Sequence, residues 1–326
     1  MKAISTITRR ATIAALIAVS FNGTAQAQST ATLVPTPITL RIGYLKGTTD
    51  LTLAKAKGSL EKALGPRNVN IEWAGPFPAA APAVEALNAD VVDITSGSST
   101  SFTSSIASNA PLVFFGYQRM TANNEGILVK KDSPIKTLAD LQGKRVAVNR
   151  GGTGEYLLVR GLEQNKVSLA NVTRQYLPPA DSGPAFAADA VDAWATWDPF
   201  LSIALETYGA RVLATGTQIG SENAIGYFSS RKFADKYPQV LQAVLDVLIQ
   251  ENRWTVDHSA EAGEIWASEL KLPKTLAPRL GKSNISPLRA LNNEDVGKIK
   301  NIAKWYLDNK VIATLPNVDA HVIQLK

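Results

Sequence analysis

YLPPADSGPAFAADAVDAWATWDPF, from Tyr176 to Phe200, holds the clearest structural signals of the chain. Residues 191–197 alternate in polarity as a β-strand does, and a short alanine-rich helical pattern precedes them. Asp198-Pro199 then ends the strand, and this pair is typical of a turn that begins a helix. Trp194 and Trp197 therefore come near the carboxyl end of a strand, where open α/β sheets bind their ligands. We predict that this segment forms one wall of a binding pocket.

Strand and helix patterns alternate on both sides of this segment. Strands are predicted at 38–44, 69–73, 91–94, 112–117, 125–129, 145–149 and 212–214, and helical patterns at 51–64, 81–88, 137–141, 156–162, 233–268 and 298–307. Such alternation is typical of mostly parallel sheets whose faces are covered by helices. We expect an α/β fold with two lobes and a ligand cleft between them. The first lobe would comprise residues 38–129 and 224–326, and the second lobe residues 130–223.

The segment from Pro178 to Pro199 also resembles a known signature, PPAD…VDAWxxWDP, of the periplasmic aliphatic sulfonate-binding proteins of ABC importers. Shorter matches lie at 41–47, 84–88, 131–135 and 138–144. The resemblance implies the type II periplasmic binding protein fold, a small-molecule ligand of the alkanesulfonate type, and an ABC permease in the inner membrane as partner. It also implies a monomer without enzymatic activity. A receptor of the same fold for taurine, nitrate, a heterocycle or a carboxylate remains the alternative.

Residues 1–27 have the organisation of a cleavable signal peptide. Lys2, Arg9 and Arg10 precede an apolar stretch, and Ala25-Gln26-Ala27 forms a small-residue cleavage pattern, so cleavage is expected between Ala27 and Gln28. The paired arginines leave general and twin-arginine export both open. The expected location of the mature protein is the periplasm.

Composition narrows the class of function. The chain has 326 residues, of which 45% are hydrophobic and 19% charged, as in globular proteins. Removing the three basic leader residues leaves 31 basic against 28 acidic ones, a net charge of +3. Because no basic run is interleaved with aromatic residues, we predict no binding of nucleic acid.

The absence of cysteine excludes disulfides, thiolate catalysis and cysteine-ligated zinc. Desulfinases and pyrimidine synthases, which resemble this receptor family, are known for a catalytic cysteine and a cysteine-rich motif. The chain also lacks a Gly-x-Ser-x-Gly nucleophile turn. His258 and His321, the only histidines, have no carboxylates at metal-ligand spacing, so we predict neither a metal ion nor a cofactor.

Two glycine- and serine-rich turns follow predicted strands. The turn Gly151-Gly152-Thr153-Gly154 could hold an anion on its backbone N–H groups at a helix start, or could be a plain turn that needs glycine. The cluster Ser96–Ser101 could supply pocket hydroxyls, or could simply cap a helix. The resemblance favours the binding interpretation for the first turn, because the family holds the sulfonate there, and both interpretations stay open for the serine cluster.

The predicted ligand site combines these turns with the Trp-Asp-Pro segment. It comprises Lys46, Gly47, Ala80, Gly97, Ser98, Gly152, Thr153, Gly154, Trp197 and Asp198. Trp194 and Trp197 should lie on opposite faces of their strand, with Trp194 in the core and Trp197 on the ligand. Asp198 could cap the next helix or orient pocket groups, and Lys46 could neutralise an anion or be solvated.

Five positions depart from the family pattern. The family has glutamine at position 45, glycine at 80, an acid at 98, histidine at 155 and arginine at 183. Here these positions hold Leu45, Ala80, Ser98, Glu155 and Gly183. The changes predict a less polar cavity, and Glu155 would repel an anion unless it points away from the site.

Overall fold

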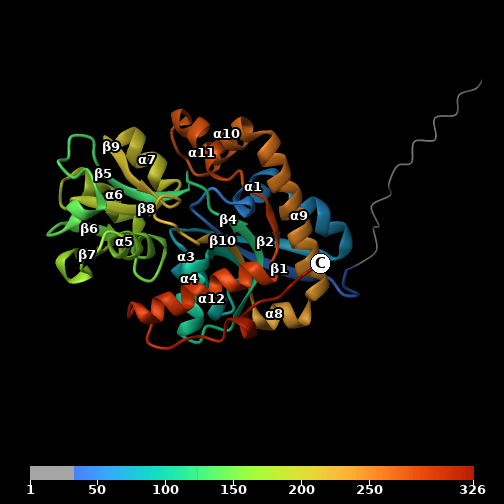
Figure 1. Ribbon diagram of the computed structural model, residues 1–326. Helices are drawn as coiled ribbons and strands as arrows, with labels where there is room; N and C mark the ends of the chain where they lie inside the picture. The colour runs from blue at the N-terminus through green and yellow to red at the C-terminus, as the bar shows by residue number, and fades with distance from the viewer. Residues whose placement is uncertain (1–32, 123) are drawn as a thin grey trace, which may run out of the picture. The chain divides into compact units, whose positions relative to one another are not determined.

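The computed structural model describes residues 33–122 and 124–326, all of which belong to one compact unit (Figure 1). The predicted signal peptide, residues 1–27, lies outside the described residues. Two sheets organise the fold, and we call the parts built on them the first and the second lobe. None of the helices in the described ranges is both long and apolar enough to cross a membrane.

The first sheet has six strands in the order β11-β4-β10-β3-β1-β2. They are β1 (Ile38–Leu45), β2 (Val69–Phe77), β3 (Ile94–Ser98), β4 (Leu112–Arg119), β10 (Ala224–Ser230) and β11 (Leu288–Ala290). The second sheet has five strands in the order β7-β6-β8-β5-β9. They are β5 (Glu125–Lys130), β6 (Arg145–Val148), β7 (Thr173–Tyr176), β8 (Ala193–Trp197) and β9 (Ala210–Thr215).

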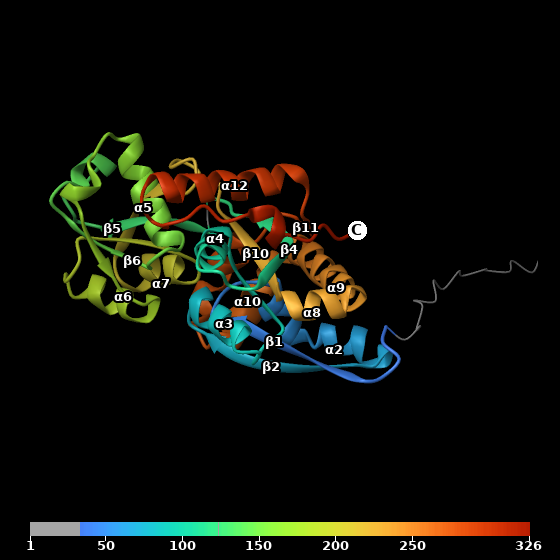
Figure 2. The same cartoon turned by 90° about the horizontal axis from the view of Figure 1, so that it is seen from below.

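Helices cover both faces of each sheet, which confirms the predicted α/β class (Figures 1 and 2). The helices of the first lobe are α1 (Asp50–Lys57), α2 (Ser59–Leu64), α3 (Ala80–Asn88), α4 (Ser99–Ala107), α8 (Arg231–Lys236), α9 (Pro238–Asp257), α10 (Ser259–Glu269), α11 (Ala277–Ser283) and α12 (Asn293–Asp308). Those of the second lobe are α5 (Thr153–Gln164), α6 (Pro179–Ala187) and α7 (Phe200–Thr207). Short 3-10 turns join some of these elements, and the predicted helix at 137–141 is such a turn, Leu138–Leu141.

Strand β4 illustrates why both faces need helices. Val113 and Phe115 contact the core under α9, whereas Phe114 between them contacts the core under α12. Because side chains alternate across a strand, a fully apolar strand must be buried on both sides. The two cores of the first lobe therefore lie on opposite faces of one sheet.

The sheets are mixed, so the prediction of mostly parallel sheets was wrong. Strands β1, β2 and β3 run parallel, as do β6, β7 and β8. Strand β10 is antiparallel to β3 and β4, and β5 is antiparallel to β8 and β9. Strand β5 is the first strand after the chain crosses into the second lobe, and β10 is the first strand after it returns to the first lobe. Each of these two strands runs antiparallel to the strands on either side of it.

The predicted first lobe boundary was also misplaced by one strand. Residues 125–129 were expected in the first lobe, but β5 pairs only with strands of the second sheet. The first crossover therefore precedes residue 125, whereas the return comes between β9 and β10, near the predicted residue 224. Periodicity identified β5 as a strand but could not identify its pairing partners.

Two local predictions also differ from the structure. Residues Ser96, Gly97 and Ser98 were expected in a loop but form the end of β3. The predicted helix at 51–64 is divided at Gly58, whose φ of 63° lies in the left-handed region and ends α1.

The two lobes repeat one arrangement. In the first lobe, strand β1 lies between β2 and β3, and in the second lobe, strand β6 lies between β7 and β8. A helix follows each of these six parallel strands. The chain around the central strands repeats residue by residue, since RIGYLKGTTD at 41–50 corresponds to RVAVNRGGTG at 145–154. No repeat was identified from the sequence, because only three of these ten positions are identical.

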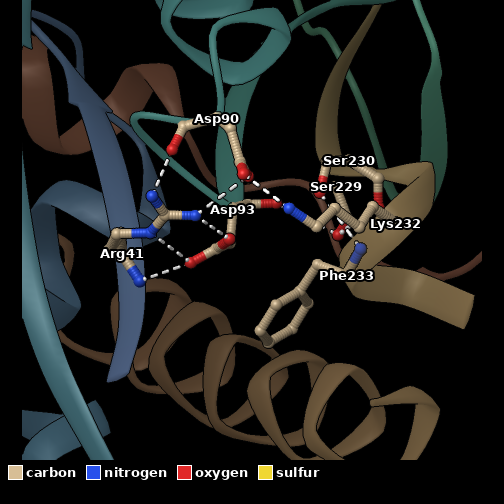
Figure 3. A network of polar contacts seen from close by, with 7 residues as sticks. All are labelled: Arg41, Asp90, Asp93, Ser229, Ser230, Lys232 and Phe233. Atoms are coloured by element: carbon tan, nitrogen blue, oxygen red, sulfur yellow. Dashed lines mark hydrogen bonds and ion pairs between the residues drawn. The ribbon is translucent and has the colours of Figure 1, made fainter. Parts of the chain in front are cut away.

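An arginine–aspartate pair marks the same place in both lobes. Arg41 donates from Nε to Asp93 Oδ2 at 3.0 Å, and Arg145 donates from Nε to Asp192 Oδ2 at 3.1 Å. Figure 3 shows the first pair, where Asp90 additionally contacts Arg41 and Lys232. Each pair joins the central strand to the residue directly before the third parallel strand, and so holds these two segments together.

Candidate functional site

A cavity of about 560 Å³ lies between the lobes and has walls from both. Every residue of the predicted site borders it except Gly154. The lining residues from the first lobe include Lys46, Gly47, Ala80, Gly97 and Ser98, and those from the second include Gly152, Thr153, Trp197 and Asp198. The structure therefore brings together residues that are up to 152 positions apart in the chain.

All six parallel strands end at this cavity. The lining contains residues at or just past the ends of β1, β2 and β3 in the first lobe and of β6, β7 and β8 in the second. The helices that follow these strands are α1, α3, α4, α5, α6 and α7. Because helix N-termini carry partial positive charge and unpaired N–H groups, their convergence favours an anion in the cavity.

Some of these helix starts have side-chain caps and others do not. Thr49 caps α1, and Ser98 caps α4 by accepting from the Ser101 N–H at 3.1 Å. The start of α3, at Ala80, has no side-chain cap, and at the start of α5 only the Gly154 N–H is bonded to a side chain, Asn149, which leaves the Thr153 N–H. Their first N–H groups are therefore available to oxygen atoms of a ligand.

Gly154 belongs to the packing of α5 rather than to the cavity wall. Its N–H donates to Asn149 Oδ1 at 2.7 Å, and a Cβ atom on it would come within 2.4 Å of the Ala195 carbonyl oxygen. Glycine is required here because α5 approaches β8 closely. The direct ligand contact expected from Gly154 thus remains a prediction, and its N–H is already engaged within the protein.

Gly97 lines the cavity for a related reason. A Cβ atom on Gly97 would lie 2.7 Å from the Phe228 ring and 2.9 Å from the Ala80 Cβ. The absence of a side chain on β3 allows the start of α3 to approach the strand. Ala80 can border the cavity only because Gly97 leaves this space.

Glu155 points away from the cavity. It is 2% exposed, and its carboxylate accepts from the Gly151 N–H at 2.7 Å, from Arg174 at 2.8 Å and from the Tyr176 hydroxyl. An arginine thus neutralises the charge within the second lobe. Because the Glu155 carboxylate is paired with Arg174 and faces away from the cavity, it does not repel an anion bound there.

The two tryptophans of β8 differ in their surroundings, although both pack against Phe200. Trp194 is 2% exposed and packs among Phe186 and Phe200, whereas Trp197 borders the cavity with its ring 5.7 Å from that of Phe200. Trp194 is a core residue, and Trp197 presents an indole surface to the cavity.

Asp198 both caps a helix and borders the cavity. Its Oδ1 accepts from the Ser202 N–H at 2.9 Å and from the Ser202 hydroxyl at 2.7 Å, as an N-terminal cap of α7 does. Its Oδ2 is buried without a hydrogen-bond partner in the described chain. Burial raises the pKa of Asp198 to about 6.

Several lining residues were not predicted from the sequence. Asn149 and Arg150 border the cavity from the second lobe, and Met120, Asn124 and Ile225 border it from the crossovers and β10. Tyr176 and Leu177 also border it, and they belong to the segment predicted as a pocket wall. The repeat would have identified Arg150, because Arg150-Gly151 corresponds to Lys46-Gly47 in the first lobe. The remaining wall is largely apolar, with Leu45, Leu177 and prolines at 78, 82, 178 and 179.

The histidines lie away from this cavity. His258 stacks on Trp254 at a ring distance of 4.9 Å, and the His321 ring is 2.8 Å from the Leu112 carbonyl oxygen. In the described parts of the chain, His, Asp and Glu residues form no group of three that could hold a metal ion.

Comparison with known proteins agrees with this geometry. The pattern of the NMT1/THI5-like family matches residues 67–262. A putative aliphatic sulfonates-binding protein of Escherichia coli strain K12 is 34% identical over 277 residues, which cover 85% of this chain and 86% of that protein.

Solved structures of such proteins superimpose closely. The alkanesulfonate-binding protein SsuA of Xanthomonas axonopodis pv. citri, bound to MOPS, has a TM-score of 0.83 at 31% identity and covers 90% of this chain and 100% of that one. The periplasmic aliphatic sulphonate binding protein SsuA of Escherichia coli has a TM-score of 0.79 at 30% identity, over 89% and 94%.

One neighbour in fold is an enzyme. The desulfurization enzyme DSZB has a TM-score of 0.64 at 15% identity and covers 88% of this chain and 96% of that one. A likeness at this identity concerns the fold alone. The periplasmic binding protein fold expected from the sequence is confirmed by the two SsuA structures. The Escherichia coli and Xanthomonas axonopodis relatives, which are at least 30% identical to this chain, are all named as binding proteins.

Proposed function

The chain belongs to the NMT1/THI5-like family, and from this membership we propose that it is the periplasmic solute-binding component of an ABC importer, with an organosulfonate as its ligand. One observation carries the proposal. The ends of six parallel strands, and the N-termini of the helices that follow them, converge from both lobes on one cavity whose other walls are apolar. Such a cavity suits a ligand with an anionic head and an apolar tail.

The head group would lie against the starts of α3 and α5, at Ala80 and Thr153, and beside the start of α4. A sulfonate presents three acceptor oxygens and no donor, and the first N–H groups of Ala80 and Thr153 are donors without a side-chain cap. Backbone N–H groups are well suited to an anion that stays ionised at every physiological pH, because no proton needs to be removed or supplied.

The tail would lie along Trp197, Leu45 and Leu177, which border the same cavity. A volume of about 560 Å³ exceeds what sulfate or nitrate would fill, and lies within the range of cavities that enclose drug-sized ligands. The apolar departures Leu45 and Ala80 favour a hydrocarbon tail over a charged one such as that of taurine. Burial of this tail would supply about 25 cal/mol for each Å² of apolar surface.

Delivery to a permease completes the proposed function. Two lobes that both contact one ligand can close on it and thereby distinguish the loaded receptor from the empty one. The signal peptide predicted at residues 1–27 would place the mature protein in the periplasm, where it would act as a monomer beside an inner-membrane permease.

Titration calorimetry tests the proposed ligand class. Alkanesulfonates of one to eight carbons and MOPS should bind, with affinity that rises as the chain lengthens, and taurine, sulfate, nitrate and alkyl carboxylates should bind more weakly. Binding of one of these other solutes with no heat from any sulfonate would refute the ligand class and leave the receptor function in place.

A further inference from the structure

Lys46 and Arg150 occupy the same position of the repeat in the two lobes. Each stands five residues after the arginine that pairs with an aspartate, directly before a glycine, and three residues before a threonine at a helix start. Both border the cavity, one from each lobe. The repeat therefore places one cation on either side of the same space.

Arg150 is held in position within the second lobe. Its guanidinium lies over the Tyr176 ring, with the Arg150 Cζ 3.6 Å from the ring centroid, and Tyr176 also borders the cavity. The Tyr176 hydroxyl donates to the buried Glu155 carboxylate, which fixes the ring. A guanidinium stacked on a fixed ring loses less freedom when it binds an anion than a freely rotating one does.

The charges of Lys46 and Arg150 are not compensated inside the protein. Neither side chain forms an ion pair with any residue of the described ranges. By contrast, Arg174, which also lies near Tyr176, is paired with Glu155 at 2.8 Å. Of the two arginines beside Tyr176, Arg174 is thus neutralised and Arg150 is free to face a ligand.

We propose that Lys46 and Arg150 form a pair of cations that flank the bound anion, so that the site selects an anion over a neutral molecule of the same shape. This inference rests on the proposed function and assigns a specificity-determining residue, Arg150, to its site. When the cavity is empty, the two like charges oppose the approach of the lobes. An anion between them reverses this effect, and closure therefore depends on the charge of the ligand.

Two ligands of similar shape, one anionic and one neutral, test whether the site selects its ligand by charge. Calorimetry compares hexanesulfonate with hexyl methyl sulfone, in which an uncharged methyl group replaces one sulfonate oxygen. We expect R150Q and K46Q each to weaken hexanesulfonate binding about tenfold at low salt and to leave sulfone binding unchanged. The dependence of the hexanesulfonate Kd on salt should become shallower in each variant.

Two further variants serve as controls. One separates the charge of Arg150 from its stacking on Tyr176, and the other tests the effect of the net charge of the protein. R150K keeps the charge without the planar guanidinium, and should retain the salt dependence. K131Q removes one positive charge from an exposed position of the second lobe outside the cavity lining, and should bind as the wild type does. Melting temperatures equal to that of the wild type confirm that the variants are folded.

Closure is followed by small-angle X-ray scattering. Hexanesulfonate should reduce the radius of gyration of the wild type, whereas the K46Q/R150Q variant should be more compact than the wild type without ligand at low salt. If the wild type binds hexanesulfonate and R150Q binds it with the same affinity and salt dependence, the proposed cation pair is refuted and the proposed function stands. If the wild type binds no sulfonate, the proposed ligand class and the cation pair are refuted together.

Discussion

Trp194 and Trp197 lie on one strand and both pack against Phe200, but only Trp197 borders the cavity. This difference predicts opposite consequences of mutation. Truncating Trp194 to alanine removes a 2% exposed ring from the core and should cost about 3–5 kcal/mol of unfolding free energy. Truncating Trp197 should cost much less stability but weaken hexanesulfonate binding at least tenfold, because the indole borders the cavity.

Urea unfolding and calorimetry on both variants check this pair. A Trp197→Ala protein that loses as much stability as Trp194→Ala, with unchanged affinity, would show that Trp197 is also a core residue.

Asp50 predicts an unusual pH dependence of stability. It is fully buried at the start of α1, its Oδ2 accepts from the Tyr227 hydroxyl at 2.8 Å, and its Oδ1 has no partner in the described chain. Burial raises its pKa from 3.8 to about 7. Between these values the folded state binds the proton that the unfolded state has lost, so stability falls as the pH rises from about 4 to 7.

Asp50→Asn should therefore melt at a higher temperature than the wild type at pH 7.5, and the difference should shrink as the pH falls toward 4. Asp192→Asn is the control, because the pKa of Asp192 is lowered chiefly by its hydrogen bond with Arg145. Its carboxylate stabilises the fold above the unfolded pKa, and this variant should melt below the wild type at pH 7.5. Equal pH profiles for Asp50→Asn and the wild type would contradict the assignment.

At the scale of single elements, two glycines should respond to alanine in opposite ways. Gly58 ends α1 with a φ of 63°, where a Cβ atom is strained. Gly297 lies within α12, and a Cβ atom there would meet open space. Gly58→Ala should lower the unfolding free energy by about 1 kcal/mol, whereas Gly297→Ala should raise it by about 0.5–1 kcal/mol.

Chemical denaturation of both variants measures these changes in unfolding free energy. A Gly58→Ala protein as stable as the wild type would mean that α1 and α2 can join without the left-handed residue.

Across the whole molecule, Asn223 connects the lobes beneath the cavity. It is 2% exposed and directly precedes β10. Its Oδ1 accepts from the Ser99 hydroxyl at 3.0 Å at the start of α4, and its Nδ2 donates to Thr153 Oγ1 at 3.1 Å at the start of α5 and to Glu125 Oε2 at 2.8 Å. One amide thus holds two cavity-lining helix starts in register.

Asn223→Ala leaves these buried groups without a partner, so we expect about 1–3 kcal/mol less stability and about tenfold weaker hexanesulfonate binding. Asn165→Ala is the control, because Asn165 is exposed at the other end of α5 and bonds only within its own helix. That variant should keep wild-type affinity. Full affinity in Asn223→Ala, despite lost stability, would show that the helix starts keep their register without this residue.

Much of the architecture could be predicted because its signals are local. Apolar periodicity identified β1, β8 and α12, and turn residues identified the starts of α5 and α7. The same turns contained most of the candidate site, since strand ends and helix starts are where α/β proteins place ligands. The alternation of side chains along a strand did not predict that both tryptophan rings pack against Phe200, which follows the end of β8.

The sequence by itself determined the alternation of strands and helices, the glycine turns and the Trp-Asp-Pro wall, because each depends on residues within a few positions of one another. Only the tertiary structure decided that β5 belongs to the second sheet, that Glu155 turns toward Arg174, and that Arg150 stands opposite Lys46 across one cavity. These features depend on pairing between segments tens to hundreds of residues apart, and the energy of such pairing is not encoded in any local pattern.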